Sequence, residues 1–192
     1  MTSLSHAVGF LQNAYTIVLA LALSEAFKQF VADSGDRNIH WNRSWSLIGF
    51  LFLIFPFFHG MSRYLYSSYL AKSETIQNAA TYLMADGIAF MSMSAFFFIM
   101  SRSFSPDRWK RYYGALALLL VIDSVWIGFA YRRGVEVGTW FVLNVILGCV
   151  LAATFFFWRS QEETQWPPAI CALTICATTI FSYFYMRDFY FS

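Results

Sequence analysis

Two side chains that can carry protons or charge lie in the aromatic run FPFFHGMSRYLY, residues 55–66. His59 and Arg63 are four residues apart, so they share one face of a helix. Pro56 lies three residues before His59 and removes a backbone hydrogen bond, which can bend a helix towards a cavity. His59 could therefore carry a proton or sense pH. The alternative is a histidine that is hydrogen-bonded within a helix bundle.

Three further polar residues, Asp86, Asp123 and Asn144, interrupt long apolar segments. At a rise of about 1.5 Å per residue, their positions along membrane-spanning helices place them at one depth together with His59 and Arg63. A charged side chain inside a span is disfavoured by at least ~2.5–3.5 kcal/mol, so such residues face the bundle interior and pair with one another. The sequence therefore predicts one polar layer in the half of the bundle nearest the termini.

Arg63 has two candidate partners in this layer, Asp86 and Asp123. The segments that carry Arg63 and Asp86 are joined by a short loop, and consecutive elements usually lie side by side. We therefore expect Arg63 to pair with Asp86. Such a layer could form a path for ions or protons, or it could be a buried structural pair that fixes the register of the helices.

The elements that position these residues are long apolar segments. The chain is 58% hydrophobic and only 12% charged, with a mean hydropathy of +0.51, which is far more apolar than a soluble protein. Helices that cross the ~30 Å hydrocarbon core need about 20 residues. Segments of this length occur at 8–31, 45–64, 79–100, 112–131, 137–158 and 168–186. The sequence predicts an all-α integral membrane protein, a single domain of about six transmembrane helices with short loops.

Lysine and arginine are unevenly distributed between the two sides of this predicted bundle. More of them fall beside loops 32–44, 101–111 and 159–167 than on the side of the termini. The positive-inside rule makes those three loops cytoplasmic. We expect a bacterial inner membrane or another cell membrane as the location, with the lipid bilayer as the first partner.

Two helix-face patterns suggest further contacts. Glu25 and Lys28, at the cytoplasmic end of the first segment, are spaced for an ion pair within one helix. Asn144, Gly148 and Ala152 recur every four residues, and small residues at this spacing let two helices approach closely. This second stripe predicts a seam between the subunits of a homo-oligomer, or a packing face within one chain.

The loop SRSFSPDRWKRYYG carries a cluster of cationic and aromatic side chains. This cluster predicts docking of a cytosolic protein partner or of anionic lipid headgroups. Its residues are Arg108, Trp109, Lys110 and Arg111. The net charge of +2 gives no reason to expect nucleic-acid binding.

Motifs of the common enzyme classes are not found in the sequence. There is no HExxH, no GxSxG, no dinucleotide fingerprint and no cysteine spacing typical of a metal site, so we expect no metal and no cofactor. The favoured interpretation is an oligomeric channel or carrier for ions or protons. Two alternatives stay open: a membrane sensor or anchor that recruits a cytosolic partner, for example in a bacterial stress or phage-defence module, and a small intramembrane enzyme.

Overall fold

The computed structural model describes the chain over residues 2–32, 41–71, 78–104, 108–135, 137–158 and 166–191. The described part of the chain is helical and contains no strand. The helices are α1 (Thr2–Ala32), α2 (Trp41–Leu65) with a π-helical extension η2 (Tyr66–Leu70), α3 (Ala79–Ser101), α4 (Trp109–Arg132), α5 (Gly138–Trp158), α6 (Trp166–Tyr185) and α7 (Arg187–Phe191).

Six of these helices, α1 to α6, are long and apolar enough to cross a membrane by their length and composition, counted over the described residues. Each predicted segment falls inside one of them or differs from it by one residue at an end. The prediction of six long apolar helices is therefore confirmed. Their boundaries were readable because polar or charged residues separate every pair of apolar runs.

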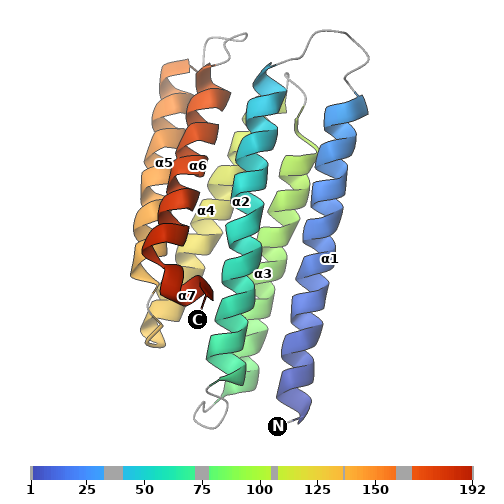
Figure 1. Cartoon of the computed structure of the whole chain (residues 1–192), viewed down its shortest axis with the longest axis vertical. Coiled ribbons are helices and arrows are strands. Elements are labelled where there is room, and N and C mark those ends of the chain that lie inside the picture. Colours follow the sequence, from blue (N-terminus) through green and yellow to red (C-terminus); the bar gives the residue numbers. More distant parts are fainter. Residues whose placement is uncertain are drawn as a thin grey trace.

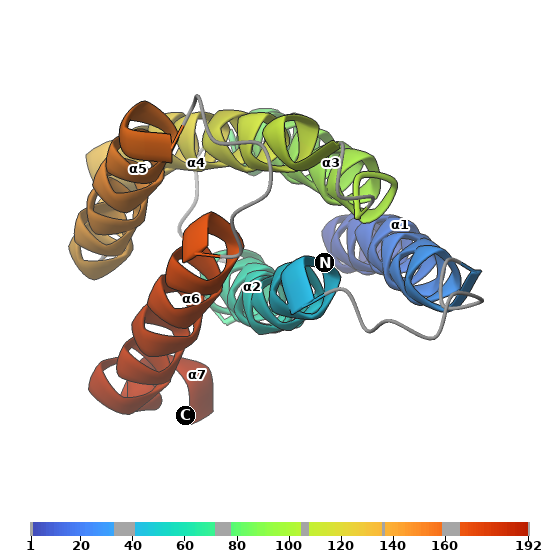
Figure 2. The same ribbon diagram turned by 90° about the horizontal axis from the view of Figure 1, so that it is seen from above.

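The helices run roughly parallel to one another, and both ends of the chain lie towards the same end of the bundle (Figure 1). Seen along the bundle, α5, α4, α3 and α1 form a curved row, and α2 and α6 lie on its concave side (Figure 2). In the series α1, α3, α4, α5, α6, α2, each helix contacts the next one, and α2 in turn contacts α1. The backbones of α2 and α3 approach closely at few points although the two helices are consecutive in the chain. They meet through long side chains instead, with Phe50 and Phe57 of α2 packing on Phe97 of α3.

The close approach of α2 to α6 depends on small residues. A Cβ at Gly49 would lie 3.3 Å from the Cα of Ala172, so a larger residue would push the two helices apart. Further along the same contact, the Thr179 hydroxyl donates a hydrogen bond of 2.8 Å to the carbonyl of Phe52. This fixes α6 against α2 and gives α2 a different neighbour from the one that chain order suggests.

The chain ends in a short helix that turns away from α6. A turn at Met186 separates α6 from α7, and α7 contacts both α6 and α2 (Figure 1). Tyr190 on α7 is 3% exposed. The last residues of the described chain therefore close one end of the space between α2, α5 and α6.

Candidate functional site

Asp86 is the centre of a buried hydrogen-bond cluster between α2, α3 and α4. Its carboxylate is 1% exposed and accepts hydrogen bonds from both η-nitrogens of Arg133, at 3.1 and 2.7 Å. The Trp126 indole donates to Oδ1 at 2.9 Å, and the hydroxyls of Tyr64 and Tyr69 donate to Oδ2. A carboxylate has about four lone-pair sites, so these donors saturate it.

Local structure brings the donors to Asp86. Tyr64 and Tyr69 are five residues apart, and the π-helical turns that follow Leu65 widen the helix so that both hydroxyls reach the same acceptor. Arg133 lies just beyond the end of α4 and folds back towards α3. Its guanidinium forms a two-pronged ion pair with the carboxylate, a geometry that is stronger than a single contact. Burial would lower the pKa of Arg133, but the hydrogen bonds and charge of Asp86 outweigh burial and raise that pKa.

The expected partner of Asp86 was wrong. The ion pair joins Asp86 to Arg133, whereas the Arg63 Nε donates a hydrogen bond of 3.0 Å to the carbonyl of Phe189. The physical reason is the face of α2 on which each side chain lies, because consecutive residues of an α-helix point about 100° apart. Arg63 therefore faces the C-terminal helix, while Tyr64, one position later, faces Asp86.

His59 and Arg63 together hold α7. The His59 ring lies 5.0 Å from the ring of Tyr190 and 5.7 Å from that of Phe191, measured between centroids. Arg63 binds the backbone of the same helix at Phe189. His59 and Arg63 thus share one face of α2, as predicted, and that face contacts α7.

Asp123 lies in a second buried region, on the wall of a pocket between α2, α4, α5 and α6. The cavity volume is about 100 Å³. Asp123 is 8% exposed, and its Oδ2 accepts a hydrogen bond from the Asn144 amide of α5. Among the described residues this is the only hydrogen bond to Asp123, and no lysine or arginine lines the pocket.

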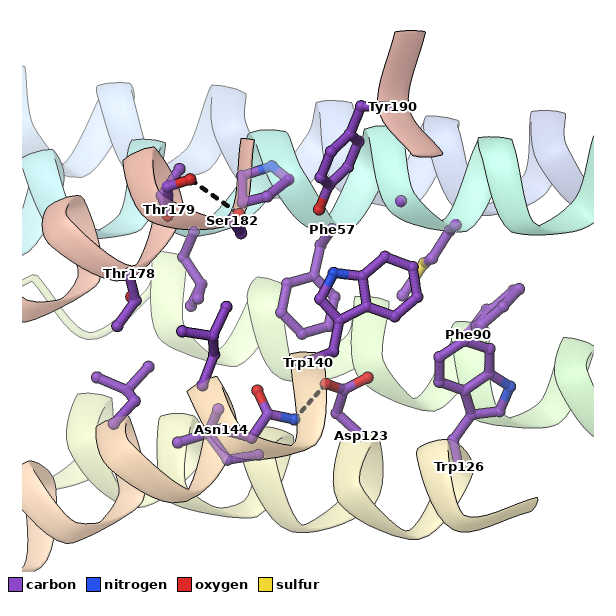
Figure 3. A pocket seen from close by; sticks show the side chains of 17 residues that line it. Phe57, Phe90, Asp123, Trp126, Trp140, Asn144, Thr178, Thr179, Ser182 and Tyr190 are labelled. Atoms are coloured by element: carbon purple, nitrogen blue, oxygen red, sulfur yellow. Dashed lines mark hydrogen bonds between the residues drawn. The ribbon is translucent and has the colours of Figure 1, made fainter. Parts of the chain in front are cut away.

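The wall opposite Asp123 carries hydroxyl groups and an aromatic side chain from the end of the chain. Figure 3 shows the Tyr190 hydroxyl pointing into the pocket from the side opposite the Asp123 carboxylate. Thr179 and Ser182 of α6 lie on the same side as Tyr190, and Ser182 donates a hydrogen bond to the Thr179 carbonyl. Burial raises the pKa of Tyr190, and its hydrogen bonds to Trp140 and Ser182 partly oppose that rise.

Two aromatic residues belong to both regions. Trp126 donates to Asp86 through its indole nitrogen, and it also lines the pocket of Asp123. Phe90 packs against Trp126 at 5.2 Å between centroids and lines the same pocket. The hydrogen-bond cluster of Asp86 therefore shares part of its side chains with the wall of the pocket.

The five residues of the predicted polar layer divide into three groups. Asp123 and Asn144 bond to each other, His59 and Arg63 both contact α7, and Asp86 belongs to the cluster of Arg133. All of them lie between helices, in three separate sets of contacts. No group of three or more His, Cys, Asp or Glu side chains gathers within the described ranges.

The remaining candidate residues lie away from this pocket or at its outer edge. Glu25 and Lys28 form a 4.0 Å ion pair within α1, with the Lys28 side chain 74% exposed. Arg108, Lys110 and Arg111 are exposed at the start of α4, and the side chain of Trp109 lies outside the described part. Gly148 and Ala152 line a groove of about 710 Å³ between α4 and α5, and Asn144 borders it as well.

Several residues of both regions were missed by sequence reasoning. Arg133 was not among the candidate residues, although its position just after the fourth apolar segment places it at the depth of Asp86. Trp140 was not among the candidate residues either, but it lines the pocket. Tyr64, Tyr69, Trp126 and Tyr190 carried no signal, because an aromatic residue in an apolar helix looks the same whether its polar atom is used or not.

Comparison with known proteins gives no relative for this arrangement. No protein-family model, curated protein or solved structure matches the chain. The function must therefore be argued from the two buried regions themselves.

Proposed function

We propose that this chain is an integral membrane carrier or channel for protons or cations, with Asp123 as the carboxylate that takes up the charge. The observation that carries the proposal is a buried acid on the wall of a pocket, held by one amide and faced by no cationic side chain among the described residues. A buried carboxylate without a partner is costly, so uptake of a proton or a cation relieves that cost.

The surroundings of Asp123 suit this role. Asn144 orients the carboxylate and leaves its Oδ1 without a hydrogen bond from the described residues. Tyr190 and Ser182 supply hydroxyls on the opposite wall, and the cavity is several times larger than the ~10–15 Å³ that one water needs. The pocket therefore has room for water beside the acid, which proton or cation exchange requires.

The membrane location is part of this proposal and rests on the six apolar helices. Their outward faces carry large apolar side chains, for example Phe10, Ile88, Phe129 and Phe184, which are all more than half exposed. In water such a surface would aggregate, whereas a bilayer would cover it. Resistance of the protein to carbonate extraction from isolated membranes is the direct test.

A flux assay tests the role of Asp123. Purified protein is reconstituted into liposomes that contain a pH-sensitive dye, and proton flux is followed under an imposed gradient of potassium. We expect flux in the wild type, flux at the level of empty liposomes for Asp123→Asn, and wild-type flux for the control Glu25→Gln on α1. Wild-type flux in Asp123→Asn would contradict the role of Asp123, and a wild type no faster than empty liposomes would contradict proton transport.

A homo-oligomer remains a prediction. The groove between α4 and α5 offers a place at which to test it. A Cβ at Gly148 would meet nothing within 4 Å, so this face of α5 has room for a neighbouring helix. If a second copy of the chain fills the groove, Gly148→Leu should reduce the mass measured by light scattering in mild detergent to that of a monomer. An unchanged mass would remove this groove as the seam.

A membrane anchor that recruits a soluble protein is the second candidate function. It is favoured by the exposure of Arg108, Lys110 and Arg111 at the start of α4. Replacing all three residues by glutamine should then release a co-purifying partner without changing the thermal stability. Proton flux that survives this replacement would assign the charges to topology or lipid contact instead.

A further inference from the structure

The pocket of Asp123 combines one carboxylate with an aromatic lining. Phe57, Phe90, Trp126, Trp140 and Tyr190 come from five different helices and all line it. Aromatic faces attract cations through the ring quadrupole, and this attraction grows when the cation is removed from water. A carboxylate in a pocket lined by aromatic side chains therefore suits an organic ammonium group.

We infer that this pocket binds a small organic ammonium ion, with Asp123 as its counter-ion and aromatic side chains, Trp140 foremost, around its alkyl groups. The inference rests on the proposed function and names the class of cation that the site would take. It does not require that the ion cross the membrane, so binding and flux can be measured separately.

The charge and polarity of the lining select this class over others. An anion would meet the Asp123 carboxylate and no cationic side chain among the described lining residues. A hard metal ion such as Ca²⁺ takes six to eight oxygen ligands, whereas most of the described lining is aromatic or aliphatic. An alkylammonium ion needs only one carboxylate, because its carbon atoms gain from contact with the apolar walls.

The size of the pocket limits the ion. The cavity volume of about 100 Å³ is room for on the order of seven water-sized groups, when each needs ~10–15 Å³. This suits an ion the size of tetramethylammonium or a short alkylamine and is too small for a bulky polycyclic cation. The amide of Asn144 fixes the carboxylate at one wall, and the pocket extends from there towards Tyr190 (Figure 3).

Trp140 is the residue that best separates this site from a simple acid. It extends from the start of α5 into the pocket, and its ring packs edge-on against Phe189 at 4.7 Å between centroids. Gly60 of α2 lies beside the Trp140 ring, and a Cβ there would make an ordinary contact with it at 3.8 Å. Replacing Trp140 by leucine keeps an apolar wall but removes the aromatic face, while Trp140→Phe keeps an aromatic face.

Isothermal titration of the full-length protein in detergent with tetramethylammonium chloride tests the inference. We expect binding that sodium chloride at equal concentration and the uncharged alcohol tert-butanol do not reproduce. Asp123→Asn should abolish it, Trp140→Leu should weaken it by about tenfold, and Trp140→Phe should recover most of the affinity. Trp166→Leu is the matched control, because Trp166 is exposed at the start of α6 and should leave the affinity unchanged.

Each result decides the inference. Equal affinity for tetramethylammonium in Trp140→Leu and Trp166→Leu, in variants that elute as folded protein, would overturn the aromatic site. No heat from tetramethylammonium in a wild type that still transports protons through Asp123 would overturn the inference and leave the proposed function intact. Binding that depends on Asp123 and Trp140 in a protein without flux would support the inference and contradict the proposed transport.

Discussion

Asp86 and Asp123 are both buried aspartates on long apolar helices, yet their surroundings are opposite. Asp86 accepts hydrogen bonds from an arginine, a tryptophan and two tyrosines. Asp123 faces a cavity and, among the residues that the structure describes, accepts a single hydrogen bond, from Asn144. Burial alone therefore does not distinguish a structural aspartate from one that can bind a ligand. The number of hydrogen-bond donors around the carboxylate makes that distinction.

The difference has a direct energetic meaning. A carboxylate that is fully hydrogen-bonded and paired has its desolvation cost offset within the protein, so it gains little by binding anything else. A buried carboxylate that has a single hydrogen-bond donor still carries much of its desolvation cost. The saturated region should therefore control folding, and the unsaturated region should control binding.

The largest effect is expected at the ion pair of Asp86 with Arg133. Either Asp86→Leu or Arg133→Leu leaves one buried charge without its partner and should lower the free energy of unfolding by ~3–5 kcal/mol, whereas the double variant should recover much of that loss. The free energy is measured by SDS titration in detergent micelles. As the matched control, Arg63→Leu should not rescue Asp86→Leu. A double variant as unstable as the sum of its singles would contradict the pairing.

Replacing each aspartate by asparagine, which has nearly the same size, compares the two residues with each other. Asp86→Asn removes the charge but also puts an amide donor against Arg133, so it should lower the free energy of unfolding by ~2–4 kcal/mol. Asp123→Asn meets only Asn144 and the cavity, and it should change the free energy of unfolding by less than ~1 kcal/mol. The same SDS titration measures both. Equal losses in the two variants would remove the distinction between a structural and a binding acid.

Trp126 allows the two regions to be separated, because it belongs to both. Trp126→Phe removes the hydrogen bond to Asp86 and keeps an aromatic ring on the pocket wall. A hydrogen bond to a charged group contributes about 1.5–3 kcal/mol, so stability should fall within that range. The affinity for tetramethylammonium should change much less than it does in Trp140→Leu. A loss of affinity with unchanged stability would contradict both roles assigned to Trp126, namely a stabilising hydrogen bond from its nitrogen and an aromatic wall that phenylalanine can replace.

Sequence reasoning predicted the helices well and the site only in part. Spans are set by the length of apolar runs, a local property, so α1 to α6 were all found, although α1 begins at Thr2 where residue 8 was predicted. The polar residues of the bundle were also picked out, because charged residues in apolar helices are rare enough to draw attention, but they divide into three groups. Partners depend on which face of a helix points at which neighbour, and chain order does not reveal this. Tyr64 of α2 reaches Asp86, whereas Arg63, one residue earlier, contacts α7 and leaves the ion pair to Arg133.

The smallest expected effect concerns the contact between α7 and the aromatic run that contains His59. The His59 ring packs against Tyr190 and Phe191, and contacts of this kind contribute about 0.5–1.5 kcal/mol each. His59→Ala should therefore loosen α7 while lowering the free energy of unfolding by only ~1 kcal/mol. Amide hydrogen exchange measured by mass spectrometry should become faster in residues 187–191, and the helices around Asp86 should keep their protection. Because Tyr190 closes one side of the pocket, the affinity for tetramethylammonium should fall as well, although Asp123 is untouched. Faster exchange around Asp86, with α7 unchanged, would instead place His59 with the saturated region.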